Sequence, residues 1–195
     1  MEATGRAAFG HGPDATDGVV RIQASRSGDG SLQLTAIPRA TGDEPEAWRA
    51  CTAPFPHEGP MPWSGAKVTN HLLFALAGDC ARARGVEEAL LCDRQGYLIE
   101  GSRSNLILVG GDGVPTAPDP SRGGVAGVGL AVLRERAPEI RERHLGPADL
   151  RAAHELLAVN AVRGPRAIVA LDGQPIGNGQ PGPVYRRLRA LFDAA

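Results

Sequence analysis

Lys67 is the only lysine in the chain, where arginine supplies the rest of the 21 lysine and arginine residues. Arginine cannot replace lysine where an amine must lose its proton and attack a carbonyl carbon. One interpretation of Lys67 is therefore carbonyl chemistry at its amine. The alternative is a solvated surface lysine that mutation has not yet replaced. The residues that follow Lys67 bear on this choice.

Two features downstream would complement a reactive lysine. Glu100 ends an apolar run and could lie under a pyridine nitrogen and keep it protonated, which is the electron-sink arrangement that pyridoxal phosphate needs. The turn 127–129 (Gly-Val-Gly) opens a helical segment and could present backbone N–H groups to a phosphate. Simpler interpretations remain. Glu100 could cap a turn beside Arg103, the glycine pair could be structural, and Asn160 could only form a turn.

The elements that must position these residues begin with β-prone runs. Residues 1–18 have no apolar period and are expected to be a poorly ordered lead-in. The runs Val19–Ser25 and Leu32–Ile37 flank a Gly-Asp-Gly turn and predict a hairpin. Trp48–Ala53 is a candidate strand, and residues 54–62, with four prolines, predict an extended connector.

From residue 64 the pattern becomes helical. Apolar residues recur on one helical face from Leu72 to Ala83, and Gly85 is expected to end the helix. The remaining strands are predicted at Ala89–Cys92, Tyr97–Glu100, Asn105–Val109, a short run ending at Thr116, Leu156–Val159 and Ala167–Leu171. Helices are predicted at about Gly127–Arg136, from Pro147, and at Val184–Phe192, with a loop at Ala117–Gly124. Strands outnumber helices, so the class is α+β or mixed α/β.

Composition narrows the function classes. The 195 residues carry 21 basic and 22 acidic side chains and a net charge of −1, so nothing indicates a nucleic-acid or anionic-membrane partner. No leader pattern begins the chain and no apolar run reaches membrane-spanning length. The three cysteines, Cys51, Cys80 and Cys92, form no CxxC pair. They indicate reduced, mostly buried thiols in a cytoplasmic protein, with neither a disulfide framework nor a metal site.

Several blocks in a fixed order resemble a known family. KVTN at Lys67–Asn70 is followed by EALLCDRQGYLIEGSRSNLILV, then by TAPDPSRGGVAGVGL and LAVNAVRGPRAIVALDG. Together they resemble the fold-type IV pyridoxal-phosphate enzymes. This is the class IV aminotransferase group, which includes branched-chain and D-amino-acid aminotransferases and aminodeoxychorismate lyases. The resemblance covers roughly residues 19–175, and EGSRSN behind a lysine is its most specific part.

The resemblance implies roles for the residues already singled out. Lys67 matches the Schiff-base lysine and general base, and Glu100 the carboxylate at the pyridine nitrogen. Val128 and Gly129 fall where the family binds the cofactor phosphate through a helix N-terminus. A threonine usually stands at the position of Gly129, so a hydroxyl is lost there.

Three more positions follow from the same resemblance. Asn160 and Ala161 lie in the loop that touches the phosphate and the substrate carboxylate, and a hydroxyl residue is frequent at the position of Ala161. His71 stands where some members place a tyrosine near the phenolic oxygen of the cofactor. A histidine on the helix surface is the other interpretation of His71.

The resemblance also implies a fold and an assembly. It predicts the C-terminal domain of this fold type, a mixed sheet or barrel-like core with flanking helices, over residues 19–195. The family's N-terminal α/β domain is expected to be largely missing, with residues 1–18 as its remnant. That domain supplies an arginine to the phosphate, and Arg21 and Arg26 are not obvious replacements. Family members are commonly homodimers, so a homodimer is expected here.

The leading functional hypothesis is an aminotransferase that acts on an amino acid and 2-oxo acid pair through a Schiff base at Lys67. The segment Asn160–Gly164 instead resembles the aminodeoxychorismate lyases, in which the same cofactor serves elimination of pyruvate. A third hypothesis, from another class, is a truncated non-catalytic homologue. It draws on the missing domain and the two lost hydroxyl positions. The survival of Lys67 together with Glu100 opposes it.

Overall fold

The computed structural model describes residues 18–42 and 44–194, and the chain divides into two compact units, residues 1–44 and 45–195. The expectation of a poorly ordered lead-in falls almost entirely on residues 1–17, which lie outside the described residues. The predicted division into residues 1–18 and 19–195 stays a prediction.

The predicted hairpin is confirmed in the first unit. Strands β1 (Gly18–Arg26) and β2 (Leu32–Ala40) pair antiparallel over their full length. The turn needs a glycine, because Gly30 has φ +87°, and its N–H donates to the Ser27 carbonyl at 2.9 Å. Every residue of β2 is exposed, so among the described residues of this unit β2 covers no core.

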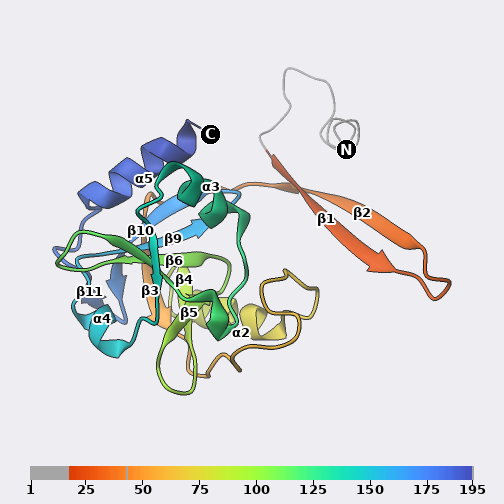
Figure 1. Cartoon of the computed structure of the whole chain (residues 1–195), viewed down its shortest axis with the longest axis horizontal. Coiled ribbons are helices and arrows are strands. Elements are labelled where there is room, and N and C mark those ends of the chain that lie inside the picture. Colours follow the sequence, from red (N-terminus) through yellow and green to blue (C-terminus); the bar gives the residue numbers. More distant parts are fainter. Residues whose placement is uncertain (1–17, 43, 195) are drawn as a thin grey trace. The chain divides into compact units, whose positions relative to one another are not determined.

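The second unit is a sheet with four α-helices (Figure 1). Its strands are β3 (Ala47–Thr52), β4 (Glu88–Cys92), β5 (Leu98–Gly101), β6 (Asn105–Val109), β7 (Pro115–Pro118), β8 (Arg141–Arg143), β9 (Glu155–Asn160), β10 (Gly164–Leu171) and β11 (Gln174–Pro175). Its helices are α2 (Leu72–Ala83), α3 (Val128–Arg136), α4 (Pro147–Arg151) and α5 (Pro183–Asp193), with a 3₁₀ turn, η1, at Pro120–Arg122.

The sheet is mixed and curled. Its strand order is β5-β4-β3-β10-β9-β6-β7-β8, with β11 paired to β10. The pairs β3–β4, β3–β10 and β7–β8 are parallel and the other pairs are antiparallel. The edge strand β5 also contacts β6 and β7 without pairing to them, so one end of the sheet curls toward its other half. This curl brings β5, which carries Glu100, toward the β7–α3 segment.

Alternation along the strands builds two apolar layers. In β6, Leu106 and Leu108 belong to the core inside the curl, while Ile107 and Val109 face the opposite layer. Helices α3 and α5 cover that outer layer through Leu133, Tyr185 and Leu188, which are all buried. Helix α2 covers a third cluster over β3 and β4 (Figure 1). The sheet is therefore a rigid base for the loops at its edges.

Most predicted elements are confirmed with ends shifted by one to three residues, and two differences stand out. Strand β8 was not predicted, because its three residues are charged, exposed and lie on an edge strand. The prediction of a loop at residues 117–124 is wrong in two places. Strand β7 extends to Pro118, and the 3₁₀ turn η1 occupies Pro120–Arg122. The cysteines are free as predicted, although only Cys51 is fully buried. No helix within the described residues is long and apolar enough to cross a membrane.

Candidate active site

Glu100 lies at the centre of the candidate site. It stands in β5 opposite Leu91 of β4, and only 3 % of its surface is exposed. The Val125 N–H lies 3.2 Å from both carboxylate oxygens. Burial raises the pKa of this carboxyl from 4.5 to about 7, against the opposing effects of the Val125 N–H and the Lys67 charge. Glu100 is therefore poised to exchange a proton near neutral pH.

A short backbone bridge brings the Lys67 segment to Glu100. Gly65 pairs with Val125, since Gly65 N–H donates to Gly124 O at 3.2 Å and Ala126 N–H donates to Gly65 O at 2.9 Å. Lys67 follows two residues later and is exposed. Its charge favours the ionised form of Glu100. The charge of the only lysine therefore acts on a buried carboxyl that is 33 residues away in sequence.

The predicted phosphate residues converge beyond this bridge. Helix α3 starts at Val128, and no side chain of the described residues caps its first turn at Gly127. Gly129 is buried against the 160–161 peptide, and a Cβ on it would lie 2.7 Å from the Asn160 carbonyl carbon. A larger residue would push these segments apart, so glycine permits their close approach. The N–H groups of the first turn of α3, which no described side chain caps, therefore begin next to this loop.

The other predicted residues have simpler local roles in the structure. The Asn160 side-chain oxygen accepts from the N–H groups of Val162 at 3.1 Å and Arg163 at 2.9 Å, which is the turn-forming role considered above. Ala161 is exposed in that turn. His71 occupies the N-cap position of α2 and is half-buried, without a side-chain cap bond. Their roles toward a cofactor stay predictions.

The serines of EGSRSN bind a second buried carboxylate that sequence reasoning missed. Glu88 is fully buried at the start of β4. Its oxygens accept from Ser102 Oγ at 2.5 Å, Ser102 N at 2.9 Å and Ser104 Oγ at 2.6 Å, and also from Ala89 N at 2.9 Å. A Cβ on Gly101 would lie 2.5 Å from Ser104 Oγ and 2.8 Å from the Glu88 carboxyl. The hydrogen bonds from Ser102 and Ser104 to Glu88, which we call the serine lock, therefore fix the chain next to Glu100.

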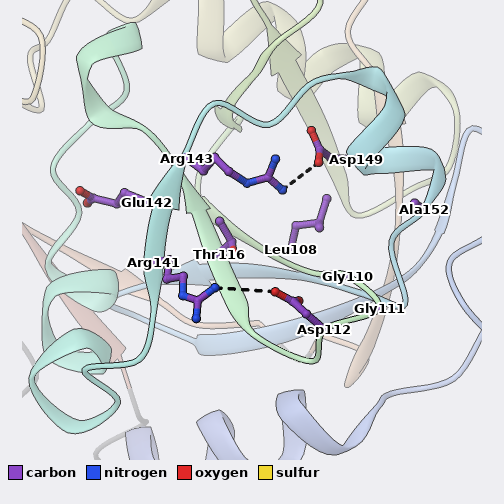
Figure 2. Close-up of a pocket in the computed structure, with 10 residues that line it drawn as sticks. All are labelled: Leu108, Gly110, Gly111, Asp112, Thr116, Arg141, Glu142, Arg143, Asp149 and Ala152. Atoms are coloured by element: carbon purple, nitrogen blue, oxygen red, sulfur yellow. Dashed lines mark hydrogen bonds and ion pairs between the residues drawn. The ribbon is translucent and has the colours of Figure 1, made fainter.

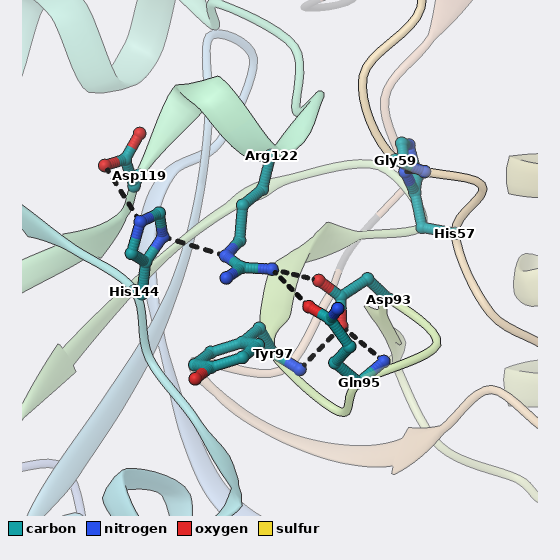
Figure 3. A network of polar contacts seen from close by, with 8 residues as sticks. All are labelled: His57, Gly59, Asp93, Gln95, Tyr97, Asp119, Arg122 and His144. Atoms are coloured by element: carbon teal, nitrogen blue, oxygen red, sulfur yellow. Dashed lines mark hydrogen bonds and ion pairs between the residues drawn. The ribbon is translucent and has the colours of Figure 1, made fainter.

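A polar network holds the segment that delivers Val125 (Figure 3). The Arg122 guanidinium donates to Asp93, and its Nε donates to His144 Nδ1 at 2.8 Å. The guanidinium also stacks 3.8 Å from the centre of the Tyr97 ring. Asp93 in turn accepts from the Tyr97 N–H at 2.9 Å, which closes the β4–β5 turn. Arg122 thus ties η1 to this turn just before Gly123–Val125 reach Glu100.

Two cavities were found in the unit, and only one of them borders the site. One of about 320 Å³ is crossed by two ion pairs, Arg141–Asp112 at 3.8 Å and Arg143–Asp149 at 2.8 Å (Figure 2). Another of about 300 Å³ borders Val125 and the start of α3. Among the described residues that line these two cavities, neither Lys67 nor Glu100 is found. The chemistry of the residues, rather than cavity size, therefore identifies the site.

Comparisons with known proteins show the family to which the chain belongs. The family model Amino-transferase class IV matches residues 2–171. The branched-chain-amino-acid aminotransferase of Escherichia coli (strain K12) is 30 % identical over 136 residues, which cover 68 % of this chain and 44 % of that protein. The structure of a fold IV-transaminase from Curtobacterium pusillum has a TM-score of 0.72 at 25 % identity, covering 86 % of this chain and 60 % of that one. A structure from Legionella pneumophila, proposed to be a 4-amino-4-deoxychorismate lyase, has a TM-score of 0.74 at 20 % identity, covering 88 % and 65 %.

The chain belongs to the class IV aminotransferase family. Its α+β fold, a curled mixed sheet with few helices, is that of the fold-type IV transaminases, as predicted. Members of this family use pyridoxal phosphate, bind amino acid substrates and are typically dimeric. The chain spans a little under half the length of the curated relative it matches.

Proposed function

We propose that this chain forms the pyridoxal-phosphate site of an aminotransferase that acts on an amino acid and a 2-oxo acid. The observation that carries the proposal is the Gly65–Val125 bridge. It brings the segment that carries the only lysine of the chain next to Val125, whose N–H contacts the buried carboxyl of Glu100. The pKa of that carboxyl is raised to about 7, and the Lys67 charge acts on it. Neither residue needs this arrangement for folding, because Lys67 is exposed and the burial of an ionisable carboxyl costs stability.

The residues present fit the cofactor. Glu100 offers a buried carboxylate that can hold a proton on a ring nitrogen, and the uncapped start of α3 at Val128 and Gly129 offers backbone donors to a phosphate. Pyridoxal phosphate, joined through its aldehyde to Lys67, supplies an electron sink for the bonds at the substrate α-carbon. Asn160 and Ala161 would border the phosphate and the substrate carboxylate, and His71 the phenolic oxygen.

Two protein groups would handle protons. The Lys67 amine must be neutral to attack a carbonyl, and once released from the aldehyde it can carry a proton to and from the substrate α-carbon. Glu100 keeps its proton below about pH 7 in the cofactor-free chain, and it would hold a proton at the ring nitrogen of the cofactor.

A second candidate, the elimination of pyruvate from aminodeoxychorismate, is favoured by the segment Asn160–Gly164. This segment resembles the lyases, and the fold is shared by both activities. The cofactor residues proposed here would be the same in either reaction. Only the substrate separates the two candidates.

The first experiment measures colour. Purified chain incubated with pyridoxal phosphate should turn yellow, and Lys67→Ala should abolish the visible band. Lys67→Arg is the matched control, because it retains the positive charge but cannot join the aldehyde. A colourless parent protein, or a yellow Lys67→Arg variant, would contradict the proposal and favour a non-catalytic homologue.

If the parent protein is yellow, the substrate can be identified next. Single L- or D-amino acids that bleach the band indicate transamination, whereas release of 4-aminobenzoate from aminodeoxychorismate indicates the lyase. We also propose a homodimer, as in the family. Light scattering coupled to size exclusion tests it, and a monomer at working concentration would contradict it.

A further inference from the structure

His57 is a buried histidine within the proline-rich connector, in contact with the candidate site. Only 8 % of its surface is exposed, and its backbone N–H donates to the Cys92 carbonyl at 2.7 Å. Its ring lies 6.0 Å from the Phe74 ring, centre to centre. On the other side, Nε2 lies 4.0 Å from Oε1 of Glu100. A polar ring in such a place needs partners for both of its nitrogens.

The local backbone fixes the tautomer of His57. The Gly59 N–H donates to Nδ1 at 3.1 Å, so Nδ1 carries no proton (Figure 3). A neutral ring must then carry its proton on Nε2, the nitrogen that faces Glu100. Burial lowers the pKa of His57, outweighing the opposite effects of Glu58 and Asp93. The ring is therefore neutral near pH 7 and offers one donor toward the carboxyl.

The charged and polar groups around Glu100 come from separate segments. The Val125 N–H reaches both carboxylate oxygens, the Lys67 charge favours ionisation, and the Glu88 charge opposes it. The loops that carry His57 and Val125 press on each other, since a Cβ on Gly123 would lie 2.5 Å from the Gly59 carbonyl oxygen. Glycine at 123, with φ +104°, makes this contact possible. The two donors are thus held on either side of one carboxyl.

We propose that His57 is a positioning residue for Glu100, whose Nε2–H donates to the carboxylate and favours the ionised form that faces the cofactor's ring nitrogen. The proposal rests on the proposed function for the cofactor, but the His57–Glu100 contact belongs to the protein alone. When Glu100 ionises, its charge attracts the Nε2–H and the gap of 4.0 Å closes to hydrogen-bond length. The ring then orients Oε1 in a site that water scarcely reaches.

Two amide variants separate this role from packing. In His57→Asn the side-chain oxygen can replace Nδ1 and accept from Gly59, but no atom reaches the position of Nε2. In His57→Gln the terminal amide can return a donor to that position. The titration of the Glu100 carboxyl is followed by ¹³C NMR of the full, cofactor-free chain with labelled glutamate, and Glu100→Gln assigns the signal. The pKa of Glu100 should rise by about one unit in His57→Asn and return toward the parent value in His57→Gln.

The same pKa in the parent and in both variants would overturn the proposal, as would an Nδ1–H tautomer of His57 in ¹⁵N–¹H correlation spectra. His154→Gln is the matched control, because His154 is an exposed histidine elsewhere in the unit and should leave the titration unchanged. A purely structural role would lower the melting temperature of both variants without moving the titration. Because no cofactor is added, failure here is distinguishable from a colourless protein, which would instead overturn the proposed function.

Discussion

Glu88 and Glu100 stand on adjacent strands, are both buried, and meet very different surroundings. Glu88, with no exposed surface, accepts hydrogen bonds from two backbone N–H groups and two serine hydroxyls. Glu100, 3 % exposed, shares one backbone N–H between its two oxygens. A buried carboxylate whose oxygens all have hydrogen-bond donors holds the chain around it and serves the structure. A buried carboxyl with few donors is left ready to change its protonation state.

The two glutamates also act on each other. The Glu88 charge contributes to the raised pKa of Glu100, although burial is the larger cause. The serine lock around Glu88 fixes the chain immediately after Glu100, because Gly101 is packed against the Glu88 carboxyl. One carboxylate therefore positions the strand end at which the other can function. Stability and chemistry are separated into neighbouring side chains.

The largest effect is expected from Glu88→Ala. The change leaves buried donors at Ala89 and Ser104 without their acceptor, so unfolding free energy should fall by about 3–4 kcal/mol. Guanidinium unfolding followed by the fluorescence of buried Trp48 measures it. Glu139→Ala, which removes an exposed carboxylate paired with Arg187, is the control and should cost under about 0.5 kcal/mol. Equal losses in the two variants would mean that Glu88 is not a structural anchor.

Glu100→Gln should instead raise the free energy of unfolding relative to the parent protein, and the gain should depend on pH. The folded-state pKa of about 7 lies above the unfolded value near 4.5, so below pH 4.5 both states hold the proton and Glu100 adds no pH dependence. Between pH 4.5 and 7 the unfolded chain releases its proton first, and the parent protein loses stability as the pH rises. The loss is at most about 3 kcal/mol. The glutamine variant has no such proton to lose.

The measurement for Glu100→Gln is therefore a difference between two pH values. The free energy of unfolding is measured for the parent and the variant at pH 4.5 and pH 8. The difference, variant minus parent, should be larger at pH 8 than at pH 4.5. Glu139→Gln should show little change of this kind, since its carboxylate is exposed. A variant whose free energy of unfolding falls relative to the parent toward pH 8 would mean that Glu100 is stabilised as an anion, and the contrast between the two glutamates would fail.

The order of elements and the site's main residues could be predicted from sequence, because they depend on local patterns. Alternating apolar residues gave the strands, and the KVTN and EGSRSN blocks identified Lys67 and Glu100. Their meeting could not be derived from spacing alone. It depends on the Gly65–Val125 bridge between two irregular segments, which no periodicity marks.

The missed residues share a physical cause. Glu88 lies just before the predicted strand Ala89–Cys92, and nothing local marks it as buried, because its serine donors lie 14 and 16 residues away. His57 lies among prolines in a connector whose pattern predicts only extended chain. A buried polar side chain needs hydrogen-bond partners, and when these partners are distant in sequence, a single sequence does not reveal them. The one available signal for His57 was its place in the sequence, a histidine upstream of the KVTN block at Lys67–Asn70.

The smallest loss of unfolding free energy that we predict comes from removing one of the two serine hydroxyls that donate to Glu88. Ser104 is buried and donates to Glu88 Oε2 at 2.6 Å, so Ser104→Ala should cost about 1–2 kcal/mol. Ser102→Ala should cost less, because Oε1 keeps the N–H donors of Ala89 and Ser102 and the half-buried site admits water. Chemical unfolding at pH 7 compares the two. A larger loss in Ser102→Ala than in Ser104→Ala would mean that Oε1 of Glu88 depends more on its serine hydroxyl than Oε2 does. The more exposed serine would then be the more important donor to Glu88.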